Sequence, residues 1–273
     1  NPTMATARKS SKPVEHDPTA LGRAFKRRLK RGDLLIGGIA TEYLRPSLVK
    51  LYRHAGFDFI YIEKEHCYLE DQLGDFVLSA RDNGMPAISK VAELGRAETG
   101  RLLDAGVVGI QLPRTESREQ LLTLIDYAKF MPHGTRAAAP CYGNVDYVWP
   151  EDTTAWLKKA NDSTVIVAHI ETAMGYENAE EIVSTPHLDM VYVGPCDFAI
   201  SMGYPGDYDH PVVKKAMGRI LNLCRKYKVA FGTTASGPVA ARKWIGRGCQ
   251  FFEAADELGL IGEAAGNLVN SYR

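Results

Sequence analysis

Two apolar runs decide the fold: TVIVAHIE at residues 164–171 and DMVYVGPCD at residues 189–197. Each begins with a nearly unbroken series of apolar residues in place of a two-residue alternation, which is typical of a parallel strand buried on both faces. The same pattern occurs in LLIGGIA at 34–40 and FDFIYI at 57–62. We therefore expect a parallel sheet that is covered on both faces.

Outward from these runs, strand-like and helical patterns alternate along the chain. Eight strands are predicted, at Leu34–Ala40, Asp58–Glu63, Ala87–Val91, Val107–Leu112, Val165–Glu171, Met190–Val193, Val229–Thr233 and Gln250–Glu253. Helices are predicted at 18–31, Arg96–Ala105, Arg118–Lys129, Asn178–Ser184 and Pro211–Tyr227. Eight such units in 273 residues predict a (β/α)₈ TIM barrel, an α/β fold.

The domain organisation follows from the same pattern. Residues 1–17 are polar and predict a disordered leader, and residues 18–273 predict one barrel domain with an N-terminal and a C-terminal helix. The segment Met131–Ala160 is long for one connection. We therefore expect it to lie over the barrel mouth, with the loop around Cys141–Trp149 selecting the substrate.

The composition argues against several classes of function. Thirty-three Lys and Arg residues balance 33 Asp and Glu residues, which predicts no binding to nucleic acid or membrane. No apolar run reaches the roughly 18 residues of a membrane helix. Five cysteines without a CxxC pair predict reduced thiols in a cytoplasmic protein. The basic run KRRLKR at 26–31 is interpreted as a solvated face or a subunit contact.

Two carboxylates follow neighbouring predicted strands. Glu171 ends one strand and Asp197 lies just after the next. Because the carboxyl ends of neighbouring parallel strands meet, both side chains can converge on one cation. Two carboxylates with water and substrate oxygens suit Mg²⁺ or Mn²⁺. The alternative is that each residue caps the helix that follows it.

Three further side chains at strand ends could take part in catalysis or substrate binding. His66 follows acidic residues and is either an acid/base or a hydrogen-bonded residue of the rim. Lys90 is a Schiff-base nucleophile, a fixed charge for an anionic substrate, or a solvated lysine. His169 faces the same side of its strand as Glu171 and either approaches the metal or packs beneath it.

Five motifs in this order resemble the HpcH/HpaI aldolase/citrate lyase family, the metal-dependent class II pyruvate aldolases. They are AGFDFIYIEKEH (55–66), LLDAGVVGIQLPRTES (102–117), PHGTR (132–136), HIET (169–172) and VGPCDFAISMG (193–203). The resemblance implies a barrel of the phosphoenolpyruvate/pyruvate type and a homo-oligomer, usually a hexamer. In such a hexamer the last helix packs against a neighbouring subunit.

The resemblance also implies roles for individual residues. Glu171 and Asp197 would hold a divalent ion, with Mg²⁺, Mn²⁺ and Co²⁺ as the candidates, and His66 would act as acid/base. Residues Gly194 and Pro195 would shape a cradle in which the backbone N–H groups of Cys196 and Asp197 hold the pyruvate carboxylate.

The chain departs from the family pattern at three positions. Glu63 stands where the family usually has Asp, and we expect it to orient His66. Lys90 stands where the family has a catalytic arginine, so it keeps the charge but loses the bidentate fork. His169 replaces a glutamine, which places an imidazole beside the metal and in contact with substrate. Glu63 and Lys90 are therefore counted with His66 as candidate catalytic residues.

The activity implied is that of a carbon–carbon lyase. It would cleave a 4-hydroxy-2-oxo acid to pyruvate and an aldehyde, or run the reverse addition, through a metal-stabilised pyruvate enolate. A decarboxylase of an oxaloacetate-type 2-oxo diacid and a CoA-ester lyase are alternatives on the same site. A non-catalytic barrel that binds a 2-oxo acid is an alternative of another class.

Overall fold

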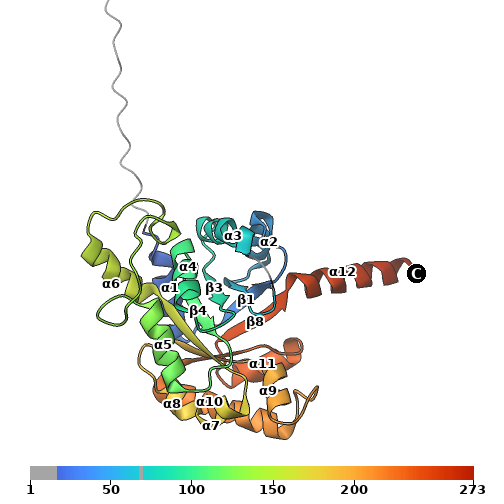
Figure 1. Cartoon of the computed structure of the whole chain (residues 1–273). Helices are drawn as coiled ribbons and strands as arrows, with labels where there is room; N and C mark the ends of the chain where they lie inside the picture. The colour runs from blue at the N-terminus through green and yellow to red at the C-terminus, as the bar shows by residue number, and fades with distance from the viewer. Residues whose placement is uncertain (1–16, 68–69) are drawn as a thin grey trace, which may run out of the picture.

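The computed structural model describes residues 17–67 and 70–273, and the expected leader at 1–16 lies outside them. Eight parallel strands close into a barrel in chain order, which confirms the predicted TIM barrel (Figure 1). They are β1 (Leu35–Ala40), β2 (Phe59–Ile62), β3 (Ala87–Lys90), β4 (Gly109–Leu112), β5 (Val165–Ile170), β6 (Met190–Val193), β7 (Ala230–Thr233) and β8 (Phe251–Asp256). Each predicted strand overlaps one of these.

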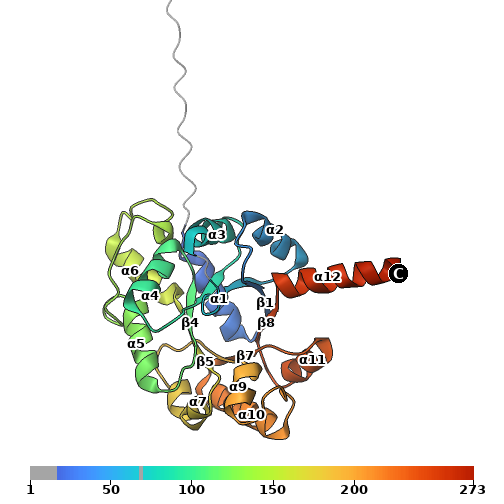
Figure 2. The ribbon, with the colours of Figure 1, turned by 45° about the vertical axis from the view of Figure 1, so that its right-hand side comes forward.

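Helices surround the ring of strands (Figures 1 and 2). They are α1 (Ala20–Arg31), α2 (Pro46–Ala55), α3 (Glu70–Asp82), α4 (Arg96–Ala105), α5 (Arg118–Ala128), α6 (Thr153–Ser163), α7 (Ala173–Glu177), α8 (Ala179–Val183), α9 (Pro195–Ser201), α10 (Pro211–Tyr227), α11 (Pro238–Gly246) and α12 (Glu257–Tyr272). A short 3₁₀ turn, η1, covers Gly143–Val145. None of the helices in the described ranges is long and apolar enough to cross a membrane.

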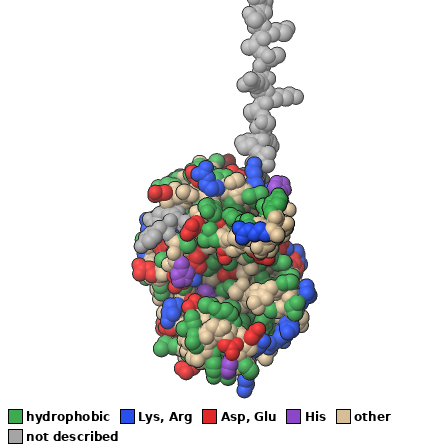
Figure 3. All heavy atoms as spheres, turned by 90° about the vertical axis from the view of Figure 1, so that its right-hand side faces the viewer, with side chains coloured by type: hydrophobic (Ala, Val, Ile, Leu, Met, Phe, Trp, Pro, Cys, Tyr) green, Lys and Arg blue, Asp and Glu red, His purple; other side chains and the backbone are tan. Residues whose placement is uncertain are grey.

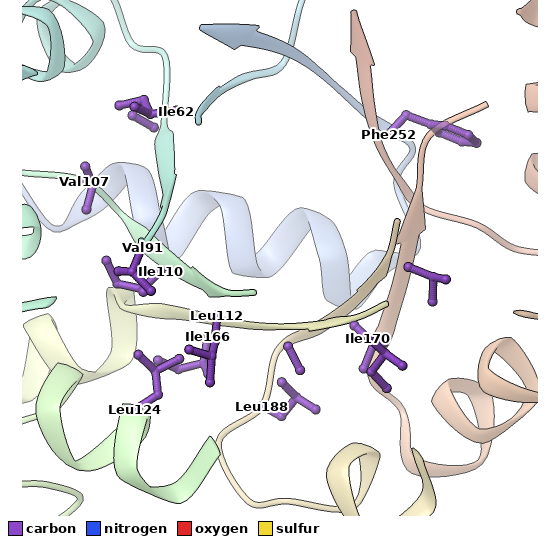
Figure 4. Close-up of a cluster of buried hydrophobic side chains, with 14 of the residues drawn as sticks. Ile62, Val91, Val107, Ile110, Leu112, Leu124, Ile166, Ile170, Leu188 and Phe252 are labelled. Carbon is purple, nitrogen blue, oxygen red and sulfur yellow. The ribbon is translucent and has the colours of Figure 1, made fainter. Parts of the chain in front are cut away.

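The larger core lies between the strands and the outer helices. Ile62, Ile110 and Ile166 are fully buried and point outward from the ring of strands (Figure 4). Phe252 of β8 does the same on the other side of the barrel. Strands that are apolar on this face as well as inside explain the unbroken apolar runs of the sequence.

Aromatic side chains close the N-terminal end of the barrel. Phe25 of α1 makes edge-to-face contacts with Phe59 at 5.7 Å and with Phe251 at 6.3 Å between ring centroids. A β-carbon on Gly37 would lie 2.1 Å from the Phe59 ring, so β1 needs a glycine there to leave room for the ring. Helix α1 crosses behind the strands in Figure 4, and this end of the barrel is therefore filled.

The long segment between α5 and β5 lies at the closed end, so the expectation that it covers the mouth was wrong. Asn144 donates to Asp104 Oδ1 at 3.0 Å, and Arg136 donates to the same oxygen at 2.6 Å. Asp104 lies near the C-terminal end of α4, where the chain is about to enter β4. A connection that leads from a helix into the next strand must lie at the N-terminal end of the strands, opposite the mouth.

Helix α12 projects away from the barrel in both ribbon views. Glu257 at its start is buried, while most of the apolar side chains farther along are exposed. Ile261 is 55% exposed, Leu268 56% and Tyr272 84%. The helix thus presents an apolar surface that its own barrel does not cover.

Candidate active site

Charged side chains gather at the C-terminal ends of the strands, where barrel proteins carry their active sites. Helix α12 follows the C-terminal end of β8, so the face from which it projects is the mouth. Figure 3 shows this face, with acidic side chains and histidine around a hollow. The mouth is therefore rich in carboxylates although the whole chain is neutral.

Glu171, which follows β5, is a deeply buried carboxylate at the mouth. Its Oε1 accepts the backbone N–H of Arg114 at 2.7 Å, and its Oε2 lies 3.1 Å from His169 Nε2. Arg114 adopts a left-handed φ of 46° in the loop after β4. The pKa of Glu171 is raised to about 7, mainly by burial and in smaller part by the nearby carboxylates of Glu65 and Asp197, while the Arg114 N–H and the Lys90 ammonium oppose the rise.

His169 is a neutral side chain that orients Glu171. Burial, together with the positive charge of Lys90, holds the pKa of His169 well below its usual value. The Gln111 amide Nε2 lies 3.4 Å from His169 Nδ1. Because the amide NH₂ only donates, Nδ1 accepts and the ring proton resides on Nε2. This Nε2 lies 3.1 Å from Glu171 Oε2, in a close contact that is not aligned as a hydrogen bond.

Gly194 brings the end of β6 against these two residues. A β-carbon there would lie 2.5 Å from His169 Nε2 and 3.5 Å from Glu171 Oε2, so any larger residue would displace the imidazole. Pro195 begins α9 directly afterwards, and Asp197 lies exposed in its first turn. Asp197 is close enough to raise the pKa of Glu171, as the predicted pairing of the two carboxylates requires.

Lys90 is a buried ammonium held between carboxylates. Its Nζ lies 3.3 Å from Glu63 Oε2 and forms a second ion pair with Glu65. Burial alone would lower the pKa of Lys90, but Glu63, Glu65 and Glu171 together raise it. A Schiff-base nucleophile needs a neutral amine, so this environment speaks against that alternative and favours a fixed positive charge.

The loop after β2 holds His66 at the rim. The His66 side chain is 67% exposed, and its Nε2 lies 3.7 Å from Glu65 Oε2. Glu63 accepts the backbone N–H of Glu65 at 2.7 Å and bonds to Lys90. Glu63, Glu65 and His66 offer ligand atoms within 4.8 Å of one another, yet the ion-pair partner of His66 is Glu65. The predicted orientation of His66 by Glu63 is therefore replaced by a contact with Glu65.

Cys196 occupies the first turn of α9 beside Asp197. Its thiol is exposed and lies 3.4 Å from Tyr208 Oη. The first N–H groups of a helix have no acceptor within the helix. The cradle for a substrate carboxylate at Gly194–Asp197 stays a prediction with which this local geometry is compatible.

Four residues of the site were missed in the sequence. Glu65 binds Lys90, Arg114 acts through its backbone, and Gln111 contacts His169. Glu253 of β8 is buried against Tyr192 and Gln111, and burial raises its pKa far above the usual value. A single polar residue inside an apolar strand is the signal that could have identified Gln111 and Glu253; Arg114 leaves no such signal, because its main chain makes the contact.

The donor set at the mouth fits a divalent cation. Glu171 and Asp197 offer hard oxygen atoms, and the pKa of Glu171 is raised mainly by burial and in smaller part by Asp197. A cation between two such carboxylates would offset both the burial of Glu171 and the repulsion from Asp197. His169, which lies 3.1 Å from Glu171 Oε2, is placed to restrict that carboxylate.

A closed parallel barrel with acidic side chains and a buried, ion-paired lysine at its mouth belongs to the class of barrel proteins that carry a polar site at the C-terminal ends of their strands. The chain belongs to the HpcH/HpaI aldolase/citrate lyase family, since residues 43–263 match the model of that family. A hydroxypyruvate/pyruvate aldolase of Cupriavidus necator is 28% identical over 86% of this chain and 87% of its own. A 2-keto-3-deoxy-L-rhamnonate aldolase of Salmonella paratyphi A is 26% identical over 93% and 94%.

Solved structures agree on the fold. An HpcH/HpaI aldolase from Desulfitobacterium hafniense superposes with a TM-score of 0.86 at 24% identity, over 90% of this chain and 95% of that one. The citrate lyase β subunit of M. tuberculosis, solved with oxaloacetate and magnesium, is more distant, with a TM-score of 0.55 at 17% identity, over 84% and 94%.

Proposed function

We propose that this protein is a metal-dependent carbon–carbon lyase that cleaves a 4-hydroxy-2-oxo acid to pyruvate and an aldehyde, or catalyses the reverse aldol addition. The observation that carries the proposal is the buried Glu171 next to Asp197, with the Lys90 ammonium close by. Family membership and relatives named as aldolases support it.

Glu171 and Asp197 would hold the metal, for which Mg²⁺, Mn²⁺ and Co²⁺ are the candidates. When bound, such a cation supplies Lewis-acid polarisation of a 2-oxo group and stabilises negative charge that develops as the bond breaks. His169 lies against Glu171, with 3.1 Å between its Nε2 and Glu171 Oε2, and thereby restricts the position of one carboxylate oxygen. Arg114 fixes the other oxygen through its backbone N–H.

The substrate carboxylate would be bound by positive charge and backbone donors. Lys90 supplies the buried charge, and the N–H groups of Cys196 and Asp197 lie at the start of α9. Gly194 lets the start of α9 lie close to His169 and Glu171. A carboxylate would compete with Glu63 and Glu65 for the ammonium, so substrate binding would loosen one of these ion pairs.

His66 would transfer the proton between solvent and the substrate hydroxyl. Its side chain is exposed at the rim, and Glu65 lies beside it as a partner for the imidazolium. An exposed imidazole is the side chain best suited to accept and release a proton near neutral pH. Glu63 takes part indirectly, because it holds Lys90.

We also propose that the chain forms a homo-oligomer, a hexamer by its resemblance to the family, and works in the cytoplasm. The uncovered apolar surface of α12 supports association with another subunit. The five cysteines are unpaired, as expected in a reducing compartment. Light scattering of the purified chain, and of a variant that ends at residue 256, tests the role of α12.

The decisive experiment follows the exchange of the methyl protons of pyruvate with D₂O, which reports enolate formation without a second substrate. We expect exchange with Mg²⁺ or Mn²⁺ that EDTA abolishes and that Glu171→Gln reduces at least about a thousandfold. The exposed Glu151→Gln is the matched control and should exchange like the natural chain.

Two other outcomes would redirect the assignment. Absence of exchange with every divalent cation, in a chain that still binds pyruvate, would support a non-catalytic barrel. Faster release of CO₂ from oxaloacetate than cleavage of any hydroxylated 2-oxo acid would support the decarboxylase.

A further inference from the structure

A sizeable cavity lies at the closed end of the barrel, away from the mouth. It measures about 530 Å³ and lies between α1, the end of α10 and the segments that lead into β6, β7 and β8. This volume is within the range of small-molecule sites. The intervening strands have four to six residues, which places the cavity roughly 15 Å from the catalytic residues.

The cavity is lined by a strong excess of positive charge. Its charged residues are Lys26, Lys30, Arg31, Arg225, Lys228 and Asp189. Five cations therefore face a single carboxylate in a chain whose net charge is zero. Part of the basic run of α1, which the proposed reaction does not use, contributes to this lining.

Two of the five cations already have carboxylate partners. Lys26 lies 2.9 Å from Asp189, and Arg31 lies 2.6 Å from Asp33.

The remaining cations are Lys30, Arg225 and Lys228, and none of them forms an ion pair with a carboxylate of the described residues. Arg225 contacts only the Asn222 amide oxygen and the backbone carbonyl of Arg247. Three positive charges around one cavity are therefore without a counterion among residues 17–67 and 70–273.

Lys228 is placed at the cavity by an unfavourable backbone conformation. It caps the C-terminal end of α10 with a left-handed φ of 58°. Helices α1, α2 and α4 use glycine at the same position, namely Gly32, Gly56 and Gly106. A lysine in this left-handed conformation is less favourable for stability than a glycine would be. The lysine, however, places a positive charge at the cavity.

The floor of the cavity is apolar. Leu29, Leu221 and Phe231 line it between the cations. An apolar floor with a cationic rim suits a ligand that has a multiply charged end and a ring or chain to pack against the floor. Guanidinium and ammonium groups together are the usual partners of phosphate oxygens.

We propose that this cavity binds an organic phosphate of about nucleotide size, at a site separate from the active site. Lys30, Arg225 and Lys228 contact the phosphate oxygens, and the organic part of the ligand packs against Leu29 and Phe231. Because Leu29 lies on α1, which closes the barrel, the ligand would contact an element of the fold and not only a surface loop.

Calorimetric titration with ATP, pyrophosphate and adenosine, without divalent cations, tests the proposal on the full chain. We expect saturable binding of ATP, weaker binding of pyrophosphate and none of adenosine. Lys228→Gly should weaken ATP binding about tenfold and raise the thermal midpoint, because glycine relieves the left-handed cap. Lys30→Ala should weaken binding similarly, and Lys50→Ala, an exposed lysine of α2, should not.

Each other result overturns the proposal. Equal ATP affinity in Lys228→Gly and Lys50→Ala would remove the cavity as the site. Equal binding of adenosine and ATP would show that charge is irrelevant, and pyrophosphate binding without ATP binding would exclude an organic ligand. Absence of saturable binding at millimolar ATP would leave the cavity without this function.

Discussion

The two ends of the barrel contain opposite kinds of side chain. At the closed end, Phe25, Phe59 and Phe251 fill the interior with aromatic rings. At the mouth, Glu171 and Lys90 are buried charges whose pKa values are shifted by their neighbours. The difference indicates that aromatic packing at the closed end stabilises the fold, whereas the buried charges at the mouth lower its stability and are available for catalysis. Changes at the two ends should therefore separate stability from activity.

The largest effect on stability is expected at the closed end. Phe25 is 2% exposed and contacts two other rings. Phe25→Ala should lower the free energy of unfolding by about 3–5 kcal/mol, because it removes buried apolar area and leaves a cavity. Urea unfolding measures the loss, and metal-dependent exchange by the folded fraction should persist. The exposed Leu51→Ala is the control, with an expected change below about 0.5 kcal/mol.

Glu253 lies in the barrel interior below the mouth. The pH dependence of its contribution to stability gives a second test of the comparison between the two ends. Burial raises its pKa far above the usual value, so the folded chain keeps the carboxyl neutral. Above about pH 4.3 the unfolded chain loses this proton and the folded chain does not. Stability should therefore fall by about 1.4 kcal/mol per pH unit from this group, up to its folded pKa. Glu253→Gln should remove that fall, which urea unfolding at a series of pH values above about pH 5 measures.

Glu257, four residues later, is the matched control with the opposite sign. Burial would raise its pKa, but the backbone N–H groups of Glu42 and Tyr43 and the hydroxyl of Thr41 lower it. Its contribution is thus present above the unfolded pKa and is lost as the pH falls through the folded one. Glu257→Gln should be less stable than the natural chain at neutral pH and no less stable in acid. A deficit of the same sign for both variants would contradict these environments.

Gly194 tests how tightly the mouth is packed. The β-carbon of Gly194→Ala would lie 2.5 Å from His169 Nε2, so the imidazole must move away from Glu171. We expect a loss of about 1–3 kcal/mol in unfolding and at least a hundredfold slower exchange of pyruvate protons. Gly95→Ala, where a β-carbon meets nothing within 4 Å, should leave the exchange rate unchanged. Equal rates in the two variants would mean that His169 does not orient Glu171.

The sequence predicted the barrel well because both faces of its strands are buried. The helices Arg96–Ala105 and Pro211–Tyr227 and the strand Met190–Val193 begin and end where predicted. The long segment after α5 was misplaced because its length was read as a sign of function. Its position follows from chain order alone, since it precedes a strand. Had each connection been classified by whether it leads into a strand or into a helix, this segment would have been placed at the closed end.

The site was predictable where a polar side chain ends an apolar strand. Glu171, Lys90 and His169 came from that rule and lie close together in the structure. The partnership of Lys90 with Glu65 depends on the path of the loop after β2, which no local pattern specifies. The contact of Arg114 with Glu171 belongs to the main chain, so side-chain identity carries no information about it.

The smallest effect on stability is expected at His66, where the consequence for activity is nonetheless large. Its side chain is 67% exposed and lies 3.7 Å from Glu65, so His66→Gln should change the free energy of unfolding by less than about 0.5 kcal/mol. Loss of a general acid/base should slow cleavage by about a hundredfold or more.

His54→Gln, on α2, is the control for loss of an imidazole outside the mouth, and the two variants should unfold alike but differ in rate. If His66→Gln kept the full rate at every pH, the proton would have to pass through another group, and the acidic side chains beside Lys90 would be the next to test. A slow but stable His66→Gln, set against an unstable but active Phe25→Ala, would complete the separation of the two ends.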